Sequence, residues 1–129
     1  MSDNDNWPPC QVDGHGLNTA IEGHVLDDQS MRAAGFNDNN NYATWYYHTC
    51  LDRNVSSKIT FNVSIPKDGS RLTIDVLDET FLQPYDYQYI LHRHPHHLVA
   101  CCIRKAVERQ MTKLTEAGIV SGHVPGDYI

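Results

Sequence analysis

The strongest constraint in this sequence is a pair of alternating segments on either side of a short turn. In residues 58–65 and again in 71–76, apolar side chains recur at every second position and polar side chains lie between them. This period of two is that of a strand with one buried face and one solvated face. Pro66 and Gly69 lie between the segments, and both residue types favour a tight reversal. The sequence therefore predicts an antiparallel hairpin of residues 58–65 and 71–78.

The C-terminal third of the chain offers the cover that this hairpin needs, because an isolated hairpin is marginally stable in water. Apolar residues between 95 and 117 recur at helical spacing and form one stripe. Pro95 suits the first helical position, and Gly118 suits the position after the last turn. A further strand is expected near residues 43–51, which are rich in aromatic side chains. The expected fold is α+β, a small antiparallel sheet packed against a long C-terminal helix of about residues 95–117.

The remaining segments predict less regular structure. Residues 27–34 indicate a short helix that ends at Gly35, and Pro84 could open another short helix. Residues 1–16 hold two prolines and two glycines, so we expect them to be irregular, with Trp7 packed on the body of the protein. The length of 129 residues fits one domain, residues 1–129, with a core of its own.

Charge and hydropathy exclude several classes of protein. The formal net charge of −6 argues against nucleic-acid binding by bulk charge and favours a basic partner. No apolar run approaches the roughly 20 residues of a membrane span. Residues 1–6 lack the basic and then apolar pattern of a secretory signal. We therefore expect a cytoplasmic protein without a membrane partner, whose four cysteines are thiols.

Two pairs of soft ligands suggest a metal site as an alternative. His48 and Cys50 share one face of the strand near 43–51, and His97 and Cys101 share one face of the long helix. Together, two nitrogen and two sulfur ligands could hold zinc in tetrahedral geometry. No CxxC or HxxxH spacing accompanies them, so the main expectation is a protein without a cofactor.

Catalysis is a second alternative. The carboxylates at the end of the hairpin and just beyond it could hold magnesium in a small hydrolase or nuclease; they are Asp75, Asp78, Glu79 and Asp86. Cys50 or Cys101 beside a histidine could act as a nucleophile. The sequence shows no nucleophile elbow and no sign of an oxyanion hole, which favours a protein that is not an enzyme.

The main functional hypothesis is a protein-binding surface made of two parts. One part is the aromatic segment 81–89, in which Tyr85 and Tyr87 are candidate contact residues because tyrosine offers a rigid amphipathic surface. Phe81 and Tyr89 are expected in the core. The other part is a basic row along the long helix, Lys105, Arg109 and Lys113, spaced four residues apart. The partner is expected to be a protein, and the oligomeric state stays open.

Several segments together resemble a group of small proteins of unknown activity from phages, prophages and other mobile elements of Gram-positive bacteria. The similar segments are Met31–Phe36, Trp45–Tyr46, residues 59–88, Glu116–Ile119, Gly122–His123 and Gly126–Ile129. The resemblance implies an accessory protein that binds a host or defence protein, and it assigns no site residue. It does not extend to the histidine-rich run 92–97.

Overall fold

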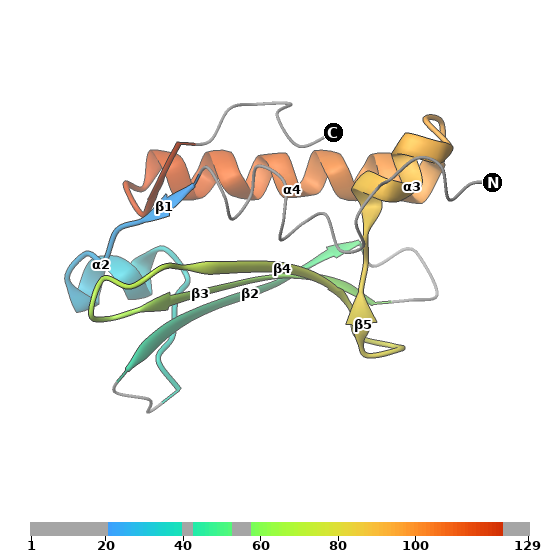
Figure 1. The fold of residues 1–129 in the computed structure, drawn as a ribbon. Coiled ribbons are helices and arrows are strands. Elements are labelled where there is room, and N and C mark those ends of the chain that lie inside the picture. Colours follow the sequence, from blue (N-terminus) through green and yellow to red (C-terminus); the bar gives the residue numbers. More distant parts are fainter. Residues whose placement is uncertain (1–20, 40–42, 53–57, 123–129) are drawn as a thin grey trace.

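The computed structural model describes residues 21–39, 43–52 and 58–122. Its elements, in chain order, are β1 (Glu22–Gly23), α2 (Asp28–Ala33), β2 (Thr44–Asp52), β3 (Ile59–Pro66), β4 (Thr73–Asp78), β5 (Gln83–Pro84), α3 (Tyr87–Arg93), α4 (Leu98–Glu116) and β6 (Val120–Ser121). Figure 1 shows α4 lying along one face of the main sheet, with α3 at one end of the molecule and α2 near the other. The expectations for residues 1–16 and Trp7 lie outside the described residues.

The main sheet has four antiparallel strands in the order β2-β3-β4-β5. At its centre, Phe61 of β3 lies opposite Thr49 of β2 and Val76 of β4. The predicted hairpin and the predicted third strand are therefore confirmed. The register between β2 and β3 shifts between Cys50 and Asp52, as happens when a bulge adds one residue to a strand.

The core lies between this sheet and α4. The alternating apolar side chains of β3 and β4 are buried, and so are Trp45 and Tyr47 of β2. The stripe of α4 packs with them in one cluster through Ala100, Ile103, Val107, Met111 and Leu114. The Oη of Tyr47 joins the two layers by donating to Oε1 of Gln110, at 2.5 Å. The α+β architecture expected from the sequence is confirmed.

The long helix begins later than predicted. Pro95 was expected at its first position, but α4 begins at Leu98 and His97 is its N-cap. The His97 amide donates to the carbonyl oxygen of His94, so residues 94–97 form a turn before the helix. The ring of His97 then accepts a hydrogen bond from the Ala100 amide through Nδ1, at 3.2 Å. This bond satisfies one of the amides that a helix leaves unpaired at its start.

Substitutions of the N-cap residue His97 test where α4 begins. A carboxylate is a better N-cap than an imidazole, and its negative charge interacts favourably with the helix dipole. We expect His97→Asp to raise the free energy of unfolding by roughly 0.5–1 kcal/mol. His97→Ala, which removes the acceptor, is expected to lower it by about 0.5–2 kcal/mol. Urea denaturation of the three proteins measures both changes, and equal stabilities would contradict the capping role.

The shorter helix also begins later than predicted from the position of its proline. Pro84 lies in β5, and the helix that it was expected to open is α3, whose N-cap is Asp86. The Tyr85 amide donates to the carbonyl oxygen of Val76, so pairing with β4 continues past Pro84 and delays the helix. The strands β1 and β6 were not predicted, because two residues are too few to show a period. Among the described helices, none combines the length and the apolar character needed to cross a bilayer.

Candidate functional site

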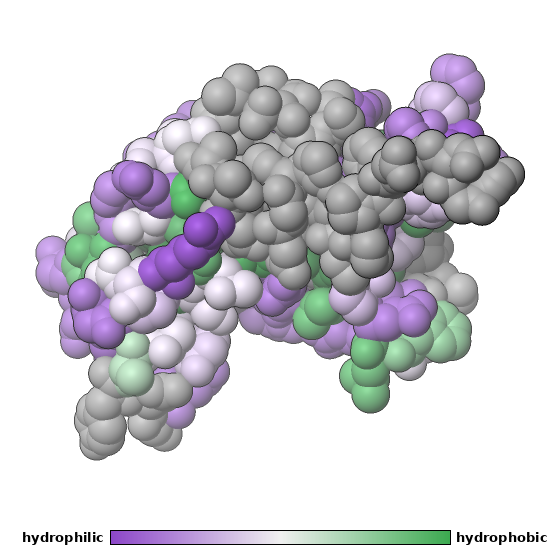
Figure 2. All heavy atoms as spheres, in the orientation of Figure 1, coloured by the Kyte–Doolittle hydropathy of each residue, from purple (hydrophilic) through white to green (hydrophobic). Residues whose placement is uncertain are grey.

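Two of the three most exposed large apolar side chains of the described residues lie in the turn that joins β4 to β5, and the third is Leu98 in α4. Phe81 is 65% exposed and Leu82 is 88% exposed. We call these two residues the apolar tip. Figure 1 places the turn at the lower right of the molecule, and Figure 2 shows hydrophobic side chains, in green, gathered there. The prediction that Phe81 belongs to the core is wrong, because the turn leads the chain away from the face that α4 covers.

Leu82 adopts a backbone conformation that is unusual for a leucine. Its φ is 55°, which lies in the left-handed region. A residue with a Cβ pays roughly 1–2 kcal/mol to adopt this conformation, and glycine or asparagine would adopt it more easily. Such strain persists only where the surrounding structure holds the residue in place.

Backbone and side-chain hydrogen bonds hold the base of this turn. Oδ1 of Asp78 accepts from the Thr80 amide at 3.1 Å. Lys58, which directly precedes β3, contacts the turn twice: its amide donates to Oγ1 of Thr80 at 3.0 Å, and its carbonyl oxygen accepts from the Glu79 amide at 2.8 Å. The two residues before the apolar tip are therefore fixed to the neighbouring strand.

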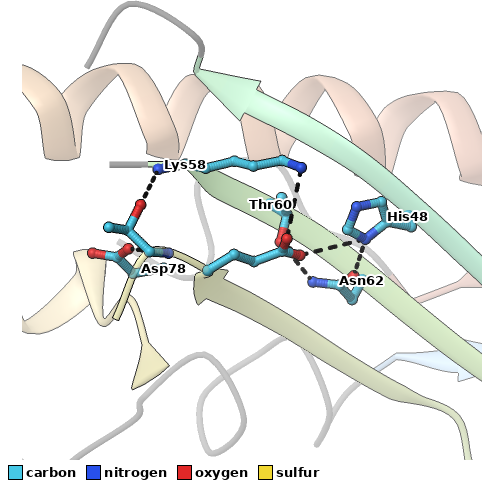
Figure 3. A network of polar contacts seen from close by, with 7 residues as sticks. His48, Lys58, Thr60, Asn62 and Asp78 are labelled. Carbon is cyan, nitrogen blue, oxygen red and sulfur yellow. Dashed lines mark hydrogen bonds and ion pairs between the residues drawn. The ribbon is translucent and has the colours of Figure 1, made fainter. Parts of the chain in front are cut away.

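A network of side chains on the outer face of the sheet extends this anchor, and we call it the polar network (Figure 3). Thr60, which is fully buried, donates its hydroxyl proton to Oε2 of Glu79 at 2.7 Å. The same hydroxyl accepts from Nδ2 of Asn62 at 3.1 Å. Oδ1 of Asn62 then lies 2.6 Å from Nδ1 of His48. The network links β2, β3 and the turn after β4.

The order of donors in this network decides the tautomer of His48. A carboxylate only accepts, so the Thr60 hydroxyl must donate to Glu79 and accept from the amide nitrogen of Asn62. The amide oxygen of Asn62 therefore faces His48, and Nδ1 of the ring must carry the proton. Nε2 is left as the acceptor of the neutral ring, whose side chain is half exposed.

A lysine ammonium group and a histidine ring flank the Glu79 carboxylate. Nζ of Lys58 lies 3.8 Å from Oε1, and Nδ1 of His48 lies 3.7 Å from Oε2. Contacts of this length between partly exposed groups contribute little to stability on their own. Their effect here is to restrict the side chain of Glu79, which directly precedes Thr80 at the base of the tip.

The structure revises the aromatic part of the predicted surface. Tyr87 is fully buried in the core cluster, so the prediction of an exposed ring at this position is wrong. Its place in the first turn of α3 directs it inward. Tyr85 and Tyr89 are partly buried, and Tyr85 packs against the core. The exposed apolar surface of segment 81–89 is provided by Phe81 and Leu82 instead.

Two residues of the predicted basic row, Lys105 and Arg109, lie on the side of α4 that faces away from the sheet, and Lys113 lies on its flank. At 100° per residue, Lys105 and Arg109 project nearly opposite the buried stripe. They contribute to a shallow hollow of about 480 Å³. We call this the α4 hollow, and its lining residues are Lys105, Glu108, Arg109, Thr112, Lys113 and Glu116. Nζ of Lys113 also donates to Oη of Tyr47 at 3.2 Å.

The predicted metal ligands are not brought together. His48 and Cys50 lie on the outer face of β2, whereas His97 caps α4 and Cys101 follows one turn later. Within the described ranges, no three side chains of histidine, cysteine, aspartate or glutamate form a cluster that could hold a metal ion. This finding also applies to Asp75, Asp78, Glu79 and Asp86, so the zinc and magnesium alternatives have no assembled site there.

Sequence reasoning missed the polar network because its members are far apart in the chain or common in type. Thr60 and Asn62 were recognised only as residues of the wet face. The cross-strand pairing of His48 with Asn62 follows from the register of β2 and β3, which sequence alone does not give. The positive φ of Leu82 could not be predicted from the sequence, because the residues that normally adopt a positive φ are glycine and asparagine.

Comparison with known proteins gives information about the fold. No protein-family model and no curated protein matches the sequence. Among solved structures, the fold is similar to that of a DUF1831 family protein from Lactobacillus plantarum, with a TM-score of 0.58. The two chains are 9% identical in sequence, and the match covers 81% of this chain and 89% of the other. At this identity the likeness concerns the fold alone.

Proposed function

We propose that the protein is a non-enzymatic binding module that docks onto another protein through the apolar tip. The observation that carries this proposal is the contrast between the exposed side chains of Phe81 and Leu82 and the anchored backbone beneath them. Exposed apolar groups rimmed by polar residues are typical of protein interfaces. Backbone strain held in place by surrounding contacts is typical of functional positions.

The anchored base supports binding because it lowers the entropic cost of association. A flexible loop loses conformational freedom when it docks, and this loss opposes binding. Here the hydrogen bonds of Asp78 and Thr80 and the polar network around Glu79 hold the turn before any partner arrives. Phe81 and Leu82 are then presented in one arrangement.

The charge around the apolar tip indicates the chemistry of the partner. Residues 75–86 carry four carboxylates and no lysine or arginine, although Asp78 is buried and Lys58 lies beside Glu79. A partner surface with an apolar recess and basic groups at its rim would complement this segment. The partner that we propose is therefore a protein with a basic surface. The resemblance to proteins of mobile elements supports a host or defence protein in this role, with the module acting as an accessory or inhibitory protein in the cytoplasm.

The variant Leu82→Asn tests the proposal without unfolding the turn. Asparagine adopts a positive φ more easily than leucine, so we expect a free energy of unfolding equal to that of the wild type or up to about 1 kcal/mol higher. The apolar contact is lost at the same time, so binding should weaken at least tenfold. The immobilised full chain is incubated at low salt with extract from cells that also make a tagged copy of it, and the retained proteins are identified.

Leu98→Gln is the matched control. Leu98 is 81% exposed, close to the exposure of Leu82, and it lies in the first turn of α4. Support requires a protein with a basic surface that is retained by the wild type and by Leu98→Gln, and is lost with both Leu82→Asn and Phe81→Ser. If the tip variants retain the same proteins as the wild type, the apolar tip is not the binding surface.

A further inference from the structure

The apolar tip and α4 carry charges of opposite sign. Around the tip lie the carboxylates of Asp75, Glu79 and Asp86, whereas Asp78 is buried. The basic surface is α4, which carries four lysine and arginine side chains and two glutamates in a chain whose net formal charge is −6. Lys105 and Arg109 are among the residues that line the α4 hollow.

The two surfaces face different directions. Lys105 and Arg109 of the α4 hollow project away from the sheet, nearly opposite the buried stripe of the helix, whereas Lys113 reaches back to Tyr47 of β2. The apolar tip lies beyond β4, at the lower right of Figure 1, whereas α4 runs along the top. A molecule therefore cannot place its own tip in its own hollow, but it can place it in the hollow of a second molecule.

The chemistry of the hollow also suits the tip. Lysine and arginine bring methylene stems that form apolar surface while their charged ends stay in water. The stems of Lys105 and Arg109, with the methyl group of Thr112, give the side chain of Leu82 apolar surface to contact. The charged ends of the same residues would meet the carboxylates around the tip, such as Glu79 and Asp86.

We infer that a second copy of this chain is a partner of the apolar tip, bound head to tail in the α4 hollow. This inference rests on the proposed function and names one partner for the same tip. Because the tip of one molecule contacts a different surface on the next, the contact leaves a free tip at one end and a free hollow at the other. Association then continues into short chains as the protein concentration rises.

Sedimentation velocity of the full chain tests the inference. The wild type is measured from about 10 µM to about 1 mM, the range in which weak protein contacts form. Species larger than a monomer are expected to grow with concentration in about 50 mM salt and to diminish in about 500 mM salt, because salt screens the charges. A wild type that stays monomeric throughout the low-salt series overturns the inference.

A mixing experiment tests the pairing of the two surfaces. Leu82→Asn has a defective tip and an intact hollow, whereas Arg109→Glu has an intact tip and a defective hollow. Each variant alone should be monomeric, and an equimolar mixture should form a heterodimer that does not extend further. Leu98→Gln should associate like the wild type. If the wild type associates but the mixture stays monomeric, the tip does not dock in the hollow.

One additional variant of each surface controls for misfolding of the first variant. These are Phe81→Ser for the tip and Lys105→Glu for the hollow. The outcome is also separable from that of the proposed function. A monomeric wild type whose tip still retains another protein with a basic surface overturns this inference and leaves the proposed function in place. If no protein, including the tagged copy, is retained through the tip, both fail together.

Discussion

Replacing Phe61 by alanine is expected to lower the free energy of unfolding by about 3–5 kcal/mol, the range for a buried aromatic residue cut back to alanine. Phe61 is fully buried on the central strand β3. Its ring meets that of Tyr47 edge to face, with 6.2 Å between the ring centroids. The substitution removes this contact and leaves a cavity between the sheet and α4, which the close-packed core cannot collapse to fill.

Urea denaturation monitored by circular dichroism measures this loss. Phe61→Leu is the matched control, because it keeps most of the apolar volume; its expected cost is smaller, roughly 1–2 kcal/mol. A Phe61→Ala protein within about 1 kcal/mol of the wild type would show that the central strand is not packed beneath α4, since a buried ring cannot be removed so cheaply.

Replacing Thr60 by valine is expected to cost about 1–2 kcal/mol, although the two side chains have nearly the same shape. The Thr60 hydroxyl donates to Glu79 and accepts from Asn62, and the side chain is fully buried. The side chain of valine can neither donate nor accept a hydrogen bond, so the polar network is interrupted at its centre. The turn that carries the apolar tip then loses part of its support, and we expect weaker binding through the tip as well.

Amide hydrogen exchange distinguishes this effect from a uniform loss of stability. In Thr60→Val the amides of Glu79 and Thr80 should exchange faster than those at the far end of β4. Thr60→Ser keeps the hydroxyl and loses a methyl group, so it should cost roughly 0.8 kcal/mol and leave these amides protected. Equal exchange at Glu79 and Thr80 in both variants would exclude the polar network as the support of the turn.

The expected sheet and helix match the structure where the signal is local. The alternation of residues 58–65 and 71–76 was enough to place β3 and β4, because each side chain of a strand points to the side opposite its neighbours. The helical spacing of the apolar residues was likewise a local signal, and it was enough to locate α4. Its first residue was misplaced, because Pro95 suits a turn as well as the first turn of a helix, and the cap is formed by His97.

In the aromatic segment 81–89, local sequence patterns did not predict which side chains are buried. Phe81 was expected in the core and is exposed, whereas Tyr87 was a candidate for the surface and is fully buried. Short irregular segments have no period, so the side that each ring faces is decided by how β5 pairs with β4 and where α3 begins. The spacing of the basic row follows from the sequence, but its location on α4 relative to the apolar tip required the fold.

The sequence by itself determined which segments form the hairpin and the long helix, and which of their faces are apolar. These properties depend on residues within a few positions of one another, because strand and helix geometry repeat over short distances. The tertiary structure decided which residues are exposed at the turn after β4, and it joined His48, Thr60 and Glu79 in one network. Contacts between residues so far apart in the chain depend on strand register and packing, which no local pattern specifies.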